Sequence, residues 1–194
     1  TTRLRRAGRS AATTASPHRY VNCSARCAAT SGERSSTLKN VLLLSDSVGG
    51  YHNGYFPGTA AALRAVAALQ HNGGTSYTPE TRRPCGTSRG VVACMPGVLG
   101  DSKWDAIHFN WGLHDICPAQ YGRVALGAYK ANLEKMFLIL RGHLGKGGTM
   151  IWRTTTPVPP KSQARRNSDV VAINAAAATL FGPGGKYPEV RVND

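Results

Sequence analysis

The stretch NVLLLSDSVGGYHNGY, residues 40–55, contains the first residue types that suggest chemistry. An apolar run leads into Asp46 and Ser47, and two glycines follow. A serine hydroxyl is an effective nucleophile only where it is held in position beside a base. Gly49 and Gly50 allow the sharp turn and the close approach of a substrate that such a serine needs. Because Ser and Asp are also common helix caps, these letters alone equally fit a strand end followed by a capped helix.

Two further polar segments follow apolar segments in the same manner. Residues 110–115, NWGLHD, come directly after WDAIHF, and residues 154–157 come directly after GTMIWR. The carboxyl ends of parallel strands meet at one edge of a sheet, where ligands bind in α/β proteins. We therefore expect these segments and Ser47 to lie close together.

The elements that must position these residues alternate along the chain. Continuous apolar runs predict buried parallel strands, and apolar residues at steps of three and four predict helices. Residues 79–103, rich in Pro, Gly, Cys and Arg, are expected to form a long functional loop. Strands are predicted at 40–46, 75–77, 104–110, 148–154 and 189–194. Helices are predicted at 57–74, 121–145 and 169–181.

The order of these elements predicts the fold class. Strands that alternate with helices through short links form a parallel sheet with helices on both faces. The helix at 121–145 presents an apolar stripe toward that sheet. The stripe consists of Leu126, Tyr129, Leu133, Met136, Leu140 and Leu144. We predict a three-layer α/β domain of the flavodoxin-like type.

Three sequence blocks together carry a resemblance. LLLSDSVGGY is similar to the first block of the SGNH, or GDSL-type, hydrolases, and WDAIHFNWGLHD is similar to their third block. IWRTTTPVP resembles the strand and loop that follow the long helix in a bacterial-type subgroup. The resemblance covers residues 40–194. It implies the SGNH fold and a serine esterase that needs neither a metal nor an organic cofactor.

The resemblance also implies roles for individual residues. Ser47 is the nucleophile and its N–H is an oxyanion donor, while Asp46 braces the turn. Gly86, in RRPCGTSRG, supplies a second oxyanion N–H, with Gly90 as the fallback and a plain loop glycine as the alternative.

The third block departs from the family pattern. It has His114 where the family has an oxyanion-hole asparagine, and a neutral imidazole N–H donates a hydrogen bond much as an amide does. Asn110 is the fallback donor, a loop histidine bonded to backbone is the alternative for His114, and Asp115 is expected to be structural.

The resemblance leaves the general base unassigned. The family carries it on a late Asp-x-x-His block, and the last histidine of this chain is His143. His52 is expected at the surface and His108 in the core of a strand. We therefore expect a hydrolase fragment that is incomplete at its C-terminus, with the base shortly after Asp194. The alternative is a non-catalytic binding module on the same fold.

The positive charge is concentrated at the N-terminus. The chain has 194 residues and a net charge of +14, of which +7 lies in residues 1–39. This Arg-, Ser- and Thr-rich segment lacks apolar periodicity and is expected to be a disordered tail or linker. A transit peptide and a nucleic-acid arm are the alternatives, but no aromatic interleaving supports the second. The compartment stays open, and no apolar run is long enough to span a membrane.

Two further features concern the environment of the expected site. The five cysteines are an odd number and are expected to be free thiols, although Cys85 and Cys94 are close enough in sequence to bridge a loop. The expected substrate is an acyl or acetyl ester of a small molecule or a carbohydrate. Six arginines near the expected loops fit an anionic or sugar-rich substrate, or alternatively a solvated surface. They are Arg82, Arg83, Arg89, Arg153, Arg165 and Arg166.

Overall fold

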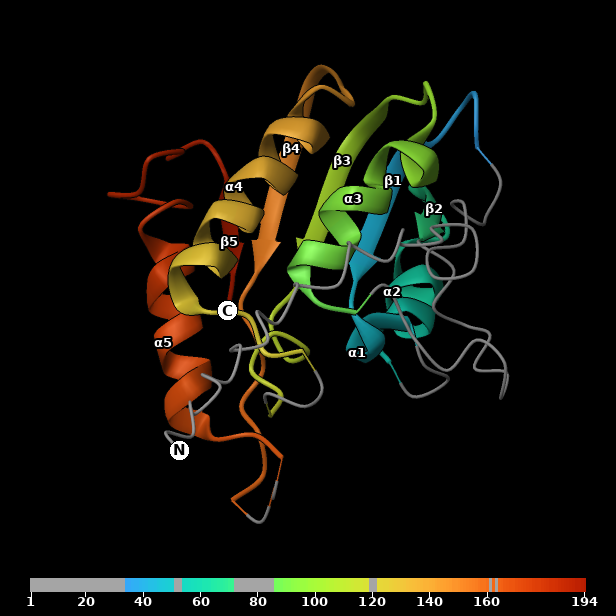
Figure 1. The fold of residues 1–194 in the computed structure, drawn as a ribbon. Coiled ribbons are helices and arrows are strands. Elements are labelled where there is room, and N and C mark those ends of the chain that lie inside the picture. The colour runs from blue at the N-terminus through green and yellow to red at the C-terminus, as the bar shows by residue number, and fades with distance from the viewer. Residues whose placement is uncertain (1–33, 51–53, 72–85, 119–121, 161, 163) are drawn as a thin grey trace, which may run out of the picture.

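The computed structural model describes residues 34–50, 54–71, 86–118, 122–160, 162 and 164–194, with Ser47 and Gly50 described by their backbone only. Within these residues, five parallel strands form one sheet in the order β2-β1-β3-β4-β5 (Figure 1). The strands are β1 (Lys39–Ser45), β2 (Ala67–His71), β3 (Trp104–Asn110), β4 (Leu144–Arg153) and β5 (Arg191–Asn193). The predicted parallel α/β fold is confirmed.

The helices fall on both faces of this sheet. They are α1 (Ser47–Gly50), α2 (Tyr55–Leu63), α3 (Ser88–Leu99), α4 (Leu126–Arg141) and α5 (Asn167–Ala178). Strand side chains alternate between faces, so Leu42, Leu44, Ile107 and Phe109 share one face. They pack with α3, α4 and α5 into the main core. We call this the core face.

The opposite face is covered differently, and we call it the second face. Helix α2 packs on it through Phe56, whose ring lies 5.5 Å from that of His71. The adjacent Tyr55 ring lies 5.5 Å from the His108 ring. A cavity of about 510 Å³ opens over this face at the carboxyl ends of the strands, lined in part by Leu43, His108 and Arg153. The second face is therefore more polar and more open than is usual for a parallel sheet.

Two elements differ from the sequence prediction near the β1–β2 edge. The predicted helix at 57–74 ends at Leu63, and residues 67–71 form strand β2, which pairs with β1. An alanine-rich segment does not distinguish the end of a helix from a short strand by periodicity. The predicted strand at 75–77 lies outside the described residues.

The prediction of a long loop at 79–103 was wrong for the second half of that segment. Ser88–Leu99 forms helix α3, although the helix contains Pro96. The buried residues Val91, Cys94, Met95 and Val98 form an apolar face that packs into the core. Cys94 is disulfide-bonded, so the expectation of free thiols was wrong for this residue, whereas Cys117 is a buried free cysteine.

The long helix was predicted too generously. Helix α4 spans Leu126–Arg141, and Leu144 already belongs to β4. Tyr129, Leu133, Met136 and Leu140 are buried as predicted, but Leu126 is 47% exposed at the first turn. The predictions for β3, for most of β4 and for α5 are confirmed to within a few residues.

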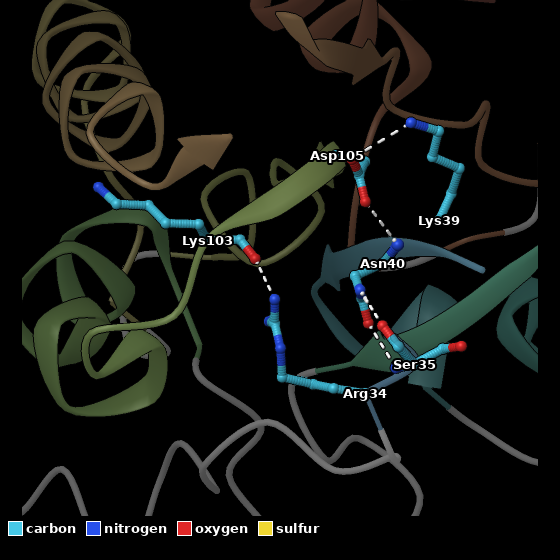
Figure 2. A network of polar contacts seen from close by, with 6 residues as sticks. All are labelled: Arg34, Ser35, Lys39, Asn40, Lys103 and Asp105. Carbon is cyan, nitrogen blue, oxygen red and sulfur yellow. Dashed lines mark hydrogen bonds and ion pairs between the residues drawn. The ribbon is translucent and has the colours of Figure 1, made fainter. Parts of the chain in front are cut away.

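The folded unit begins before Asn40, which was the predicted boundary. Asn40 and Ser35 form two hydrogen bonds (Figure 2). The Ser35 N–H donates to Asn40 Oδ1 at 2.9 Å, and Asn40 Nδ2 donates to the Ser35 carbonyl at 2.8 Å. The Asp105 carboxylate accepts the Asn40 N–H at 2.8 Å, and Arg34 donates to the Lys103 carbonyl. Residues 34–39 are thus fastened to the amino ends of β1 and β3. Residues 1–33 lie outside the described part.

Candidate active site

The polar carboxyl ends of four neighbouring strands lie along one edge of the sheet. Ser45 of β1 pairs in register with Asn110 of β3, and Arg153 of β4 pairs with Asn193 of β5. Ser47 follows Ser45 by two residues and begins helix α1. The candidate site therefore lies at the carboxyl edge, on elements that the core holds rigidly.

The turn after β1 needs glycine for packing reasons. A Cβ atom on Gly49 would lie 2.6 Å from Ser45 Cβ and 2.7 Å from the Phe56 ring, and one on Gly54 would lie 2.5 Å from the Gly49 carbonyl oxygen. Contacts this short exclude any side chain unless the backbone moves. The glycines therefore let the turn pack directly against β1 and α2.

Asp46 holds this turn from inside the protein. Its side chain is only 2% exposed, and its Oδ1 accepts the N–H of Val48 at 3.0 Å. Burial raises the pKa of Asp46, while the nearby His114 and the N–H groups of Val48 and Leu113 lower it. The carboxylate thus braces the turn after β1 and lies close to the loop after β3.

His114 lies in that loop, residues 111–118. Burial lowers its pKa, the negative charge of Asp46 opposes this effect, and the positive charge of Arg165 adds to it. A histidine with a lowered pKa is neutral at neutral pH and keeps one ring N–H for donation. The structure therefore brings a neutral imidazole next to Asp46, the residue that precedes Ser47.

The fallback donor, Asn110, is occupied elsewhere. Its Nδ2 donates to the carbonyl oxygens of Arg153 at 2.7 Å and of Thr154 at 3.2 Å. Both amide hydrogens are therefore used to hold β3 to the end of β4. This geometry favours His114 over Asn110 as a donor at the site.

Gly86 lies at the start of the segment that leads into α3. Its φ of 67° is in the left-handed region that favours glycine. The fallback, Gly90, donates its N–H to the Thr87 carbonyl at 2.9 Å inside α3. The structure thus favours Gly86 over Gly90 as the backbone donor.

Asp115 ties this segment to the loop after β3. Its carboxylate accepts the Ser88 N–H at 3.0 Å and the Ser88 hydroxyl at 2.6 Å, and Asn132 of α4 donates to that hydroxyl at 3.0 Å. Burial raises the pKa of Asp115 to about 6, although the Ser88 bonds oppose the shift. Asp115 therefore holds Ser88, which follows Gly86 by two residues, against the loop after β3.

Gly112 allows the loop after β3 to pack against β4 and α5. A Cβ atom at this position would lie 2.3 Å from Thr155 Oγ1 and 2.7 Å from Ile173 Cδ1. Thr155 is fixed in turn by two hydrogen bonds with Asn174, both 2.9 Å long. The loop that carries His114 is therefore clamped between two elements.

Three residues around the site were not predicted from the sequence: Ser88, Asn132 and, in its position, Arg165. Arg165 donates from Nε to the Leu113 carbonyl at 2.6 Å and lies close enough to His114 to affect its pKa. These contacts join residues that are 27 to 52 positions apart. No local pattern signals them.

Besides His114, the described part of the chain contains His71, His108 and His143. His108 lies on the second face, 9% exposed, and burial lowers its pKa to about 4. His143 contacts the Ser102 carbonyl at the amino edge of the sheet, at 2.9 Å from Nδ1. His52 lies outside the described residues. In the described part of the chain, no group of three or more His, Cys, Asp or Glu side chains is arranged to hold a metal ion, and no helix is long and apolar enough to cross a membrane.

Known proteins resemble this chain in structure rather than in sequence. No model of a protein family matches the sequence, and neither does any curated protein. A catalytic mutant of the acetylxylan esterase Axe2 from Geobacillus stearothermophilus matches with a TM-score of 0.56 at 16% identity, covering 84% of this chain and 78% of that one.

Two further solved structures agree with this match. A GDSL-like lipase from Bacteroides thetaiotaomicron gives a TM-score of 0.52 at 10% identity, covering 79% of this chain and 67% of its own. The acetyl xylan esterase AlAXEase gives a TM-score of 0.52 at 9% sequence identity, and the match covers 72% of this chain and 71% of that one. The chain has the fold of the SGNH, or GDSL-type, ester hydrolases.

Proposed function

We propose that this protein is a serine ester hydrolase with Ser47 as the nucleophile. The observation that carries the proposal is the meeting of three segments at the carboxyl edge of the sheet. These are the turn that begins with Asp46 and Ser47, the segment at Gly86, and the loop with His114. Asp46 lies between the first and third segments, and Asp115 joins the second segment to the third.

In the proposed reaction, the Ser47 hydroxyl attacks the ester carbonyl. The N–H groups of Ser47 and Gly86 and the ring N–H of His114 stabilise the negative oxygen of the tetrahedral intermediate. The intermediate then expels the alcohol, which takes the proton that the general base removed from Ser47, and leaves the acyl group on Ser47. Water hydrolyses this acyl-serine ester, which releases the acid and restores the Ser47 hydroxyl. The lowered pKa of His114 supports this role, because a neutral imidazole does not need to lose a proton before it donates.

We propose that a histidine in sequence beyond Asp194 is the general base. Two observations support this placement. His71, His108 and His143 of the described residues lie away from the Asp46 turn or are buried on the second face. The cavity of about 510 Å³ lies beside the end of β5, with Asn193 and Asp194 in its lining.

The proposed substrate is an acyl or acetyl ester, carried by a small molecule or a carbohydrate. The names of the Axe2 and AlAXEase structures, both acetylxylan esterases, support a carbohydrate ester. Thr154, Thr156 and Asn174 line the adjoining cavity and offer hydroxyl and amide groups for sugar hydroxyls.

The test compares the hydrolysis of p-nitrophenyl acetate by residues 1–194 with hydrolysis by a longer protein that continues past Asp194 along the same gene. We expect the extended form to be at least about a hundredfold faster, the usual contribution of a general base. The Ser47→Ala variant should lose this gain. Absence of turnover in both forms would instead favour a non-catalytic binding module.

The role of His114 has its own control. His114→Ala should lower kcat by about 10²–10³-fold, as loss of an oxyanion-hole donor does. His114→Asn should recover much of that loss, because an amide donates a hydrogen bond but does not act as a base at neutral pH. If the Asn variant is as slow as the Ala variant, His114 is not acting as a donor.

A further inference from the structure

An arginine-lined pocket lies beside the loop that carries His114. The pocket has a volume of about 420 Å³, and Arg123, Arg165, Arg166 and Asp169 contribute its charges. Among the described lining residues, three guanidinium groups accompany one carboxylate, and the buried Asp46 lies close enough to Arg165 for their charges to interact. We call this cavity the arginine pocket.

The contact between Asp169 and Arg123 shows how a guanidinium of the arginine pocket binds an anionic group. Its two carboxylate oxygens accept from Arg123 Nη2 at 2.6 Å and from Nη1 at 3.3 Å. This paired contact uses the planar fork of the guanidinium, which fits carboxylate and sulfate groups. Arg123 is therefore neutralised. Arg165 interacts through its charge with the buried Asp46 carboxylate, and Arg166 forms no ion pair with a described residue.

Arg165 is held rigidly between the pocket and the candidate site. Its Nε donates to the Leu113 carbonyl at 2.6 Å, and its Nη2 lies 3.0 Å from Cys117 Sγ. A cation that is fixed in advance loses little entropy when it binds an anion. Because Leu113 precedes His114, a group bound at Arg165 would lie next to the proposed oxyanion site.

Arg166 adds an exposed cation at the start of α5. It occupies the N-cap position, where no side chain caps the helix. An arginine has no acceptor atom for this task, so the first N–H groups of α5 lack a capping side chain. The helix dipole favours negative charge at the same place.

We propose that the arginine pocket binds the carboxylate or sulfate group of an acidic carbohydrate, as a subsite of the ester substrate. None of the described lining residues is aromatic, whereas proteins bind single-stranded nucleic acids on aromatic stacking surfaces. The assignment to a substrate rests on the proposed function. Binding in the pocket does not require Ser47.

The test is calorimetric titration with trigalacturonate, and with xylotriose as the neutral control. Trigalacturonate should bind at least about tenfold more tightly than xylotriose, because charge-assisted bonds are the stronger ones. A sulfated neutral trisaccharide decides between carboxylate and sulfate as the preferred anion. Equal binding of trigalacturonate and xylotriose would overturn the proposal.

Two substitutions in the pocket should act in opposite directions. Arg166→Gln should weaken trigalacturonate binding by about fivefold to tenfold, since it removes a charged donor. Asp169→Asn should strengthen binding, because it removes the competing carboxylate and releases Arg123. The matched control is Arg64→Gln, an exposed arginine at the end of α2 that should change nothing. A variant that only unfolds the protein cannot give the gain expected of Asp169→Asn.

The remaining arms separate this inference from the proposed function. The Ser47→Ala variant should bind trigalacturonate as the parent does. If the extended chain binds trigalacturonate but hydrolyses no ester, the esterase proposal is wrong and the pocket assignment stands. If neither Arg166→Gln nor Asp169→Asn changes binding, the pocket assignment is wrong. If oligothymidine binds more tightly than trigalacturonate and Arg166→Gln weakens that binding, the ligand of the pocket is a nucleic acid and not an acidic carbohydrate.

Discussion

The carboxylate of Asp115 accepts both the backbone N–H and the hydroxyl of Ser88, at 3.0 and 2.6 Å, across 27 residues of sequence. This contact holds the segment that starts at Gly86 against the loop that carries His114. Since both residues are at most 1% exposed, water cannot replace the bonds if the carboxylate is removed. The geometry of the proposed oxyanion site therefore depends on a residue that does not touch the substrate.

Asp115→Ala should destabilise the protein by about 2–4 kcal/mol, because it leaves two buried donors of Ser88 unsatisfied. The measurement is urea unfolding followed by circular dichroism. Asp101→Ala, at an exposed aspartate, is the control and should change stability by less than about 0.5 kcal/mol. Equal effects of the two substitutions would show that the Ser88 contact is not important for the fold.

Gly112→Ala should also destabilise the protein, by about 1–3 kcal/mol, because the new Cβ meets Thr155 and Ile173 in a packed region. Gly127→Ala is the matched control. A Cβ at Gly127 meets nothing within 4 Å, and the residue lies in α4, where alanine is the better helix former. We expect the midpoint temperature of thermal unfolding to fall for Gly112→Ala and to rise slightly for Gly127→Ala. If Gly112→Ala leaves the midpoint unchanged, the loop adjusts to the new side chain.

Two buried groups should give opposite pH dependences of stability. The pKa of Asp115 is raised to about 6 from 3.8, so its contribution is full below pH 3.8 and is lost as pH rises through 6. The pKa of His108 is lowered to about 4 from 6.5, so its contribution is present above pH 6.5 and is lost as pH falls through 4. Between pH 4 and 6 the two slopes oppose each other.

Substitution should reveal each slope by itself. Without Asp115, as in Asp115→Asn, the free energy of unfolding should rise more steeply from pH 4 to 6 than in the parent, by at most about 1.4 kcal/mol per pH unit. Without His108, as in His108→Asn, it should fall over the same range relative to the parent. Urea unfolding at pH 4, 5, 6 and 7 measures both effects. If the free energy of unfolding depends on pH in the same way in the parent and in both variants, the two pKa shifts are refuted.

The sequence predicted the sheet better than its helices. Continuous apolar runs such as WDAIHF identify β3 and most of β4, because a strand buried on both faces needs no alternation. Helix α3 escaped prediction because Gly90, Pro96 and Gly97 interrupt it, yet its apolar face still packs into the core. Tertiary packing thus overrode local propensity there.

For the site, the sequence predicted residue types and their order but not their partners. His114 and Asp115 were recognisable in NWGLHD, and the Gly86 segment was recognisable beside the cysteine. Contacts between distant segments, such as Arg165 with Leu113, depend on how the loops after β3 and β4 meet. A resemblance in short blocks carries no information about such contacts.

The central claim, that Ser47 is the nucleophile, is tested most directly by mapping a covalent adduct. The chain, as printed and extended through its coding sequence, is incubated with a fluorophosphonate and digested, and the modified peptide is sequenced by mass spectrometry. Ser45, in the same Ser-Asp-Ser triplet, provides a matched control, since it is buried in β1 at 4% exposure. We predict one adduct on Ser47, which Ser47→Ala removes and Ser45→Ala retains. An adduct on another residue, or none on the folded extended chain, would contradict the account.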